Sequence, residues 1–210
     1  MGDWYAFADS FPNGVSPAAS QIRSKGLRPG IWLAPFIVKR SSRLFSEHPE
    51  WLIRNHRRKP ANAGFVWNTF TAGLDVSHPD VQDYAAELVS TAVEDWGFRY
   101  LKLDFLYAGV LKGVRHDRTV TRAQALTTAF QRIRSSARPD VELLGCGCPL
   151  GSGVGIFDIM RIGADVAPDW FPAFFGLHFP FSRELAFPAA RNAIRNILTR
   201  MSMHNRWWIN

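Results

Sequence analysis

The sequence predicts an α/β fold with a parallel sheet, either a (β/α) barrel or a doubly wound sheet. Two observations lead to this prediction. Segments with strand character alternate along the chain with segments of helical periodicity, and this order gives parallel strands joined by helical crossovers. The 210 residues, 47% of them hydrophobic, are enough for one sizeable core and predict a single domain over residues 1–210.

The first third of the chain predicts a helix, a strand and a long irregular segment. Ser16 suits the beginning of a short helix that Gly26 ends. The largely apolar run 28–36 predicts a buried strand. The segment 37–71 is expected to be irregular, with one short helix before Pro49, and loops of this length are usually functional.

The clearest predicted element is a helix in the middle of the chain. A short strand is expected over 73–76, and Ser77 with Asp80 matches a capping box at the start of the helix, which Gly97 ends. The apolar positions of this helix keep helical spacing: Val81, Tyr84, Ala85, Leu88, Ala92, Val93 and Trp96.

The same alternation continues to the carboxyl end. Strands are expected over 99–105 and 141–147, in 156–165, where the strand runs into a loop, and in the final "RWWIN". Helices are expected over 121–137 and 188–204. No GxGxxG or Walker-type loop opens any of these helices, which argues against a nucleotide-binding fold.

The charge of the chain does not indicate a nucleic-acid partner. The formal net charge is +7 and the pI is about 9.9, a balance that first suggests nucleic acid. However, the densest basic run, "RNHRRK" over 54–59, stands alone, and no zinc-finger spacing or RNP-like pattern accompanies it. A solvated basic loop is the favoured interpretation.

Hydropathy and cysteine usage indicate the compartment. No apolar run of about 18 residues is present, so no membrane span is expected, and the amino-terminal segment lacks the features of a signal peptide. Cys146 and Cys148 are too close in sequence for an easy disulfide, and two thiols make a poor zinc site. Free thiols, buried or lining a pocket, fit a reducing, cytoplasmic location.

Charged residues follow two of the predicted strands, at the end where parallel α/β folds place their active sites. Asp104 follows "YLKL", with Lys102 two residues before it, so both side chains should lie on one face of the strand. The lysine would keep Asp104 ionised, and an ionised, oriented carboxylate suits a nucleophile. A purely structural ion pair fits the position equally well.

Asp165 is the second candidate, in a loop with Arg161 upstream and aromatic neighbours downstream. An apolar pocket would raise the pKa of Asp165 and keep it protonated, which suits a general acid. Asp169 and Asp158 are the alternatives for this role, and Asp158 looks more structural. Two carboxylates in different protonation states are the working parts of a glycosidase. Tryptophans near proposed loops or strand ends could pack on sugar rings, although half of them are expected to be ordinary core: Trp4, Trp32, Trp67, Trp170, Trp207 and Trp208.

An ordered set of segments carries a family resemblance over nearly the whole chain. The segments are "GDWYAFADSFPNG", "GLRPGIWLAPF", "HPEWLI", "LDVSHPDVQDY", "YLKLDF", "RIGADVAPDW" and "WWIN". In this order they resemble the α-galactosidases of the melibiase type, in glycoside hydrolase clan D and closest to family 36.

The resemblance implies a (β/α)8 catalytic barrel and retaining hydrolysis of terminal α-galactosides, with an oligosaccharide as substrate and no metal or organic cofactor. It implies that Asp104 is the nucleophile and Asp165 the acid/base. The positions that it implies for sugar binding are Lys102, Arg161, Trp32 and the loop with Cys146 and Cys148.

The sequence departs from the family pattern at its ends. The aspartate pair of the family's first strand is not found, and "WWIN" stops where the family continues with an aspartate. A complete barrel typically has about 250 residues, so an incomplete barrel without its first and last strands is expected. Its open edges would favour association into a homo-oligomer.

Two further alternatives stay open. A non-catalytic or degenerate barrel that binds carbohydrate is one, although both carboxylates are present. An α-N-acetylgalactosaminidase or a galactosyl-transferring enzyme is the other, because no residue in the sequence separates these specificities from hydrolysis of galactosides.

Overall fold

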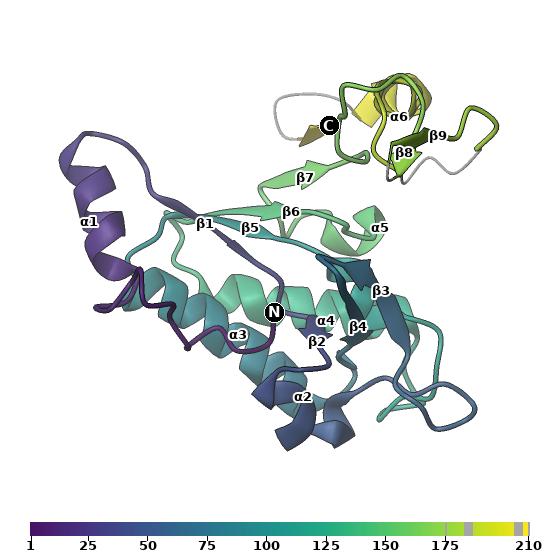
Figure 1. Cartoon of the computed structure of the whole chain (residues 1–210). Helices are drawn as coiled ribbons and strands as arrows, with labels where there is room; N and C mark the ends of the chain where they lie inside the picture. Colours follow the sequence, from purple (N-terminus) through teal and green to yellow (C-terminus); the bar gives the residue numbers. More distant parts are fainter. Residues whose placement is uncertain (175, 183–186, 204–207, 210) are drawn as a thin grey trace. The chain divides into compact units, whose positions relative to one another are not determined.

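The computed structural model describes residues 1–174, 176–182, 187–203 and 208–209. By its internal contacts the chain forms two compact units, residues 1–157 and residues 158–210, where the sequence predicts one domain (Figure 1). The first unit contains most of the regular structure.

Three parallel strands form the centre of the first unit. They are β1 (Gly30–Leu33), β5 (Tyr100–Leu103) and β6 (Glu142–Gly145), in the spatial order β1-β5-β6. The register aligns Leu33 with Leu103 and Leu103 with Gly145, so the three strands end at the same level. Each strand lies within a segment predicted to be a strand, and the parallel pairing confirms the predicted α/β class.

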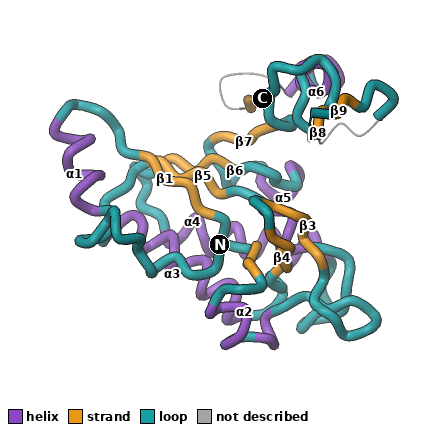
Figure 2. The backbone as a smooth tube through the Cα atoms, in the orientation of Figure 1, coloured by secondary structure: helices purple, strands orange, loops and turns teal. Residues whose placement is uncertain are grey.

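The two crossover helices lie side by side on one face of this sheet (Figures 1 and 2). They are α3 (Pro79–Glu94) and α4 (Arg122–Ser136). Leu101 and Leu103 of β5 are fully buried, while Lys102 between them is only partly buried. Because side chains alternate along a strand, the leucines occupy one face of β5 and Lys102 the other. The face with Lys102 carries the candidate site.

The start of α3 differs from the predicted capping box. His78, not Ser77, is the N-cap residue, and its Nδ1 accepts a hydrogen bond from the Asp80 N–H at 3.2 Å. The Ser77 hydroxyl donates instead to Asp75 Oδ1 at 2.8 Å. Asp75 is 2% exposed, and a buried carboxylate needs such donors, so it draws Ser77 away from the helix end.

The same buried carboxylate ties two loops together. Arg115 Nη1 lies 2.9 Å from Asp75 Oδ1, and the His116 N–H donates to Asp75 Oδ2 at 2.6 Å. The side chains of Arg115 and Asp75 are 8% and 3% exposed. This ion pair fixes the segment before α3 against the segment that follows η2 (Leu106–Val110).

The segment predicted to be irregular forms a small antiparallel sheet. Its strands are β2 (Ile37–Lys39), β3 (Asn62–Val66) and β4 (Thr69–Gly73), in the order β2-β4-β3. The strand predicted over 73–76 is therefore wrong, because β4 ends at Gly73 and pairs within this sheet. The short helix predicted before Pro49 is confirmed as α2 (Arg43–Glu47), which is followed by η1 (Pro49–Trp51).

The remaining elements of the first unit are two short helices. One is α1 (Ser16–Ser24), which confirms the first predicted helix, and the other is α5 (Leu150–Gly153), which was not predicted. Gly26 follows α1 with a φ of 73°, a left-handed conformation that favours glycine and suits the end of a helix.

In the described residues of the second unit there are two pairs of strands, one α-helix and a short 3-10 helix. β7 (Ile159–Arg161) pairs in parallel with β10 (Trp208–Ile209), and β8 (Ala173–Phe174) pairs antiparallel with β9 (Leu177–His178). The helix is α6 (Ala190–Thr199), followed by η3 (Met201–Met203). The end of the helix predicted over 188–204, and most of "RWWIN" with Trp207, lie outside the described residues. None of the described helices is both long and apolar enough to span a membrane.

Candidate active site

Asp104 occupies the carboxyl end of the central strand. Its N–H donates to the Leu33 carbonyl at 2.8 Å, and the Cys146 N–H donates to the Leu103 carbonyl at 2.8 Å. These bonds carry the parallel pairing one residue beyond β5. The backbone of Asp104 is thereby fixed beside the ends of both neighbouring strands, and its side chain is only 13% exposed.

Both oxygens of the Asp104 carboxylate accept hydrogen bonds. Trp32 Nε1 donates to Oδ2 at 3.0 Å, and the Phe105 N–H donates to Oδ1 at 2.7 Å. Lys102 Nζ lies 3.8 Å from Oδ2, which confirms that the two charged side chains share a face. Hydrogen bonds to an ionised acceptor are stronger than neutral ones, so these donors orient the carboxylate.

Phe105 supplies its backbone donor through an unusual conformation. Its φ is 52°, in the left-handed region that a bulky side chain rarely adopts. This turn ends the extended strand at Asp104 and leads into η2. A backbone group that contacts a candidate site carboxylate in this way has no signature in the sequence.

Aromatic rings surround Trp32 on the same face. The centroid of the Trp32 ring lies 5.7 Å from that of Trp4, 5.1 Å from that of Trp67 and 6.2 Å from that of Phe105. Trp32 is aligned with Lys102 in the β1–β5 register, so its place on this face follows from the strand pairing. We call these four residues the aromatic cluster. Trp4 and Trp67 were expected among the tryptophans near loops or strand ends, whereas Phe105 was not a predicted site residue.

The loop after β6 brings the two cysteines to the same strand ends, and the two do not form a disulfide. Cys146 is fully buried, whereas Cys148 is partly exposed. Burial, and then the neighbouring Cys146, raise the pKa of the Cys148 thiol to about 12. Gly147 has a φ of 55°, and a Cβ there would lie 3.2 Å from the ring of Tyr107. Contact with substrate remains a prediction for both thiols, and Cys148 is the one with exposed surface.

Arg161 and Asp165 lie in the second unit. Arg161 is the last residue of β7, and its Nη1 is hydrogen-bonded to Asp165 Oδ1. The sequence predicted an apolar pocket around Asp165. The structure shows instead a carboxylate that is 65% exposed and paired with an arginine. Of its rivals, Asp169 is paired with His178 at 3.1 Å, and Asp158 immediately precedes β7.

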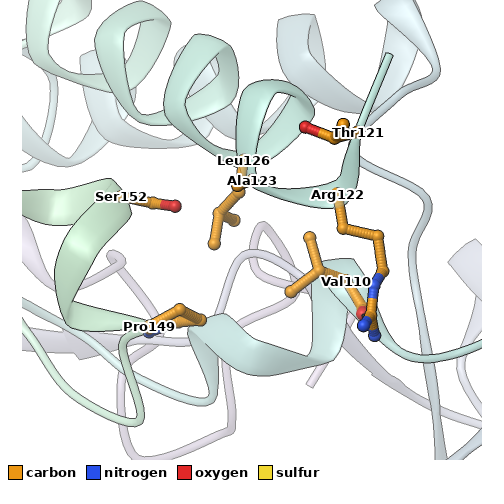
Figure 3. A pocket seen from close by; sticks show the side chains of 7 residues that line it. All are labelled: Val110, Thr121, Arg122, Ala123, Leu126, Pro149 and Ser152. Carbon is orange, nitrogen blue, oxygen red and sulfur yellow. The ribbon is translucent and has the colours of Figure 1, made fainter. Parts of the chain in front are cut away.

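A cavity of about 430 Å³ lies elsewhere in the first unit, between η2, the first turns of α4 and α5 (Figure 3). Its lining residues are Val110, Thr121, Arg122, Ala123, Leu126, Pro149 and Ser152. None of the predicted site residues lines it, so it is a separate feature from the strand-end site. Within the described ranges, no group of three or more His, Cys, Asp or Glu side chains could hold a metal ion.

The sequence is similar to a known family of glycosidases. The family model described as Melibiase matches residues 1–159. An α-galactosidase of Escherichia coli is 27% identical over 166 residues, which cover 77% of this chain and 22% of the relative. One from Hypocrea jecorina is 30% identical over 168 residues, which cover 75% of this chain and 21% of the relative.

Solved structures show the same similarity. The α-galactosidase TtGalA of Thermus thermophilus, in complex with p-nitrophenyl α-D-galactopyranoside, superposes with a TM-score of 0.79 at 38% identity over 92% of this chain. The same enzyme in complex with stachyose gives the same score. The fold is therefore that of a partial (β/α)8 barrel. The chain spans 38% of the Thermus chain and about a fifth of the Escherichia coli and Hypocrea relatives.

Proposed function

Because the chain belongs to the melibiase family, we propose that it hydrolyses terminal α-galactosides with retention of anomeric configuration. The observation that carries this proposal is the Asp104 carboxylate, held at the end of β5 by Trp32 and by the Phe105 N–H. The complexes of the Thermus enzyme with an aryl galactoside and with stachyose support an α-galactoside as the substrate class.

In the first step, Asp104 acts as nucleophile. One of its carboxylate oxygens attacks the anomeric carbon of the galactosyl unit, and the bond from that carbon to the leaving oxygen breaks. Asp165 donates its proton to the leaving oxygen. The product of this step is a glycosyl ester of Asp104. The hydrogen bonds of Trp32 and Phe105 hold the nucleophile in one orientation, so little reorganisation is needed at the moment of attack.

In the second step, water replaces the enzyme at the anomeric carbon. Asp165, now a carboxylate, removes a proton from the water as its oxygen attacks, and the ester bond to Asp104 breaks. Two inversions give net retention. Lys102 and Arg161 are proposed to donate hydrogen bonds to sugar hydroxyls. Trp32 is proposed to line the sugar pocket, together with the loop of Cys146 and Cys148.

Covalent labelling tests the nucleophile. The native protein is treated with a cyclophellitol of α-galactose configuration, digested and mapped by mass spectrometry. We expect one adduct, on the peptide with Asp104, and no adduct in Asp104→Asn. Asp158→Asn is the matched control and should be labelled as the wild type is. An adduct on another carboxylate would overturn the assignment, and sugar binding without turnover or labelling would favour a non-catalytic barrel.

A second experiment tests the acid/base. Asp165→Ala should hydrolyse p-nitrophenyl α-galactoside slowly, because the activated leaving group needs no proton while the ester intermediate then lacks its base. Added azide should speed the reaction and give the α-azide, the retained product. Asp169→Ala should behave like the wild type. A β-azide from Asp165→Ala would instead identify that residue as the nucleophile.

A further inference from the structure

The turn between β3 and β4 carries an exposed tryptophan in a strained backbone conformation. Trp67 and Asn68 have φ values of 49° and 59°, and the two residues form the whole loop of the hairpin. Hairpins with such loops favour asparagine or glycine at both positions. A tryptophan in the left-handed region is rare, and residues held in this way occur often at functional sites.

The Trp67 ring lies against Trp32, which contacts the candidate nucleophile, without being buried. Its centroid is 5.1 Å from that of Trp32, whose Nε1 donates to Asp104 at 3.0 Å. It is also 6.4 Å from the ring of Phe105. Nevertheless, Trp67 is 60% exposed. Contacts therefore run from the carboxylate through Trp32 to Trp67 and then to solvent, all within residues 1–157.

We propose that Trp67 binds the leaving-group portion of an oligosaccharide α-galactoside and determines the preference for that substrate class. This inference rests on the proposed function. If Asp104 attacks the anomeric carbon, the galactosyl unit lies against Trp32, and the part of the substrate beyond the glycosidic oxygen extends outward from it. An exposed aromatic ring in contact with Trp32 offers an apolar surface on which the CH face of a second sugar packs.

The other exposed aromatic residues of the hairpin do not lie against Trp32 as Trp67 does. Phe65 and Phe70 are directly cross-strand partners, with ring centroids 5.1 Å apart, and they are 58% and 54% exposed. Neighbouring Val66, like Trp32, packs against the buried residues Ala34, Ile37, Ala63 and Ala108. Phe65 is next to Val66 in the strand and therefore points to the opposite face. Phe65 is therefore a matched control of similar size and exposure.

Two substrates separate the leaving-group site from the galactose pocket. Stachyose has sugars beyond the glycosidic oxygen, whereas α-galactosyl fluoride has only a fluoride ion to release. In the native protein, Trp67→Ala should lower kcat/KM for stachyose by about tenfold and leave that for the fluoride within about twofold. Trp67→Phe should recover most of the loss, and Phe65→Ala should match the wild type on both substrates.

A binding measurement does not depend on turnover. In the inactive Asp104→Asn variant, stachyose should shift the tryptophan fluorescence, and the additional change Trp67→Phe should abolish most of that shift. Equal losses on both substrates, or no loss on stachyose, would overturn the inference and leave the proposed function standing. A wild-type protein that hydrolyses neither substrate would overturn the proposed function, and this inference with it.

Discussion

Trp32 Nε1 donates a hydrogen bond of 3.0 Å to Asp104 Oδ2, across the pairing between β1 and β5. The two residues are 72 positions apart in the chain, and the parallel register brings them together. A hydrogen bond to a charged group contributes about 1.5–3 kcal/mol. The bond thus links the geometry of the sheet directly to the orientation of the proposed nucleophile.

Trp32→Phe keeps an aromatic ring and removes this donor. We expect the variant to fold and to react with the α-galactose-configured cyclophellitol roughly tenfold to a hundredfold more slowly than the wild type. The measurement is the second-order rate constant of labelling at Asp104. Trp4→Phe is the matched control, because the Trp4 ring packs on Trp32 and its buried Nε1 has no hydrogen-bond partner in the described part of the chain. Equal rates for Trp32→Phe and the wild type would contradict the role given to the bond.

The buried ion pair of Asp75 and Arg115 should be important for stability rather than for chemistry. Asp75→Asn would leave the guanidinium, with its side chain 8% exposed, without its charged partner. Removing one partner of a buried pair costs about 3–5 kcal/mol, so the free energy of unfolding in urea should fall by that amount. Glu47→Gln is the control, since its pair with Arg43 is exposed and should matter little. If Asp75→Asn unfolded at the same urea midpoint as the wild type, the prediction would be refuted.

The parallel strands and their crossover helices could be predicted because their signals are local. The apolar spacing of α3 and the alternation in β5 are both visible within a few neighbouring residues. The antiparallel sheet could not be predicted in this way. Its register pairs Ile37 with Gly73, far away in the chain, and its hairpin turns at Trp67–Asn68 without the glycine that usually marks such a loop.

The features of the candidate site that could be predicted are also the ones with a local signal in the sequence. The spacing of Lys102 and Asp104 places them on one face of a strand, and the structure pairs them. Trp32 was one of several tryptophans expected near strand ends, and the family resemblance singled it out. The N–H of Phe105 and the position of Trp67 depend on positive φ angles that tertiary packing imposes, so periodicity and composition hold no information about them. The Asp165 carboxylate is 65% exposed, which shows that aromatic neighbours in sequence need not enclose a side chain.

Gly73 should tolerate no side chain. A Cβ at this position would lie 2.2 Å from the Ala108 carbonyl oxygen, a backbone atom that cannot move aside easily. Gly73→Ala should therefore lower the free energy of unfolding by about 1–3 kcal/mol, as overpacking does. Gly151→Ala is the control, for which the free energy of unfolding should change in the opposite direction. No atom lies within 4 Å of its added Cβ, and the change should stabilise by about 0.4–1 kcal/mol. Thermal and urea unfolding measure the stability of both variants. A Gly73→Ala variant as stable as the wild type would contradict the close packing of β4 on η2.

The Cys148 thiol should be unreactive at neutral pH and should make stability depend on pH in alkali. Burial raises its pKa in the folded protein to about 12, from an ordinary value of 9.0. Below pH 9 the thiol is protonated in both states and contributes no pH dependence. Between pH 9 and about pH 12 the unfolded chain loses this proton while the folded chain keeps it, so stability should fall as pH rises. Cys148→Ala should show a shallower fall over that range.

Alkylation gives an independent measurement of the same thiol. The thiolate is the reactive form, so in a Cys146→Ala background iodoacetamide should modify Cys148 far more slowly in the native protein at pH 8.5 than in urea at the same pH. Raising the pH toward 11 should increase the native rate about tenfold per unit, because the thiolate fraction rises in that proportion while the pH stays below the pKa. Native alkylation at the rate seen in urea would mean that the loop after β6 leaves the thiol open to water, and the shift in its pKa would then be absent.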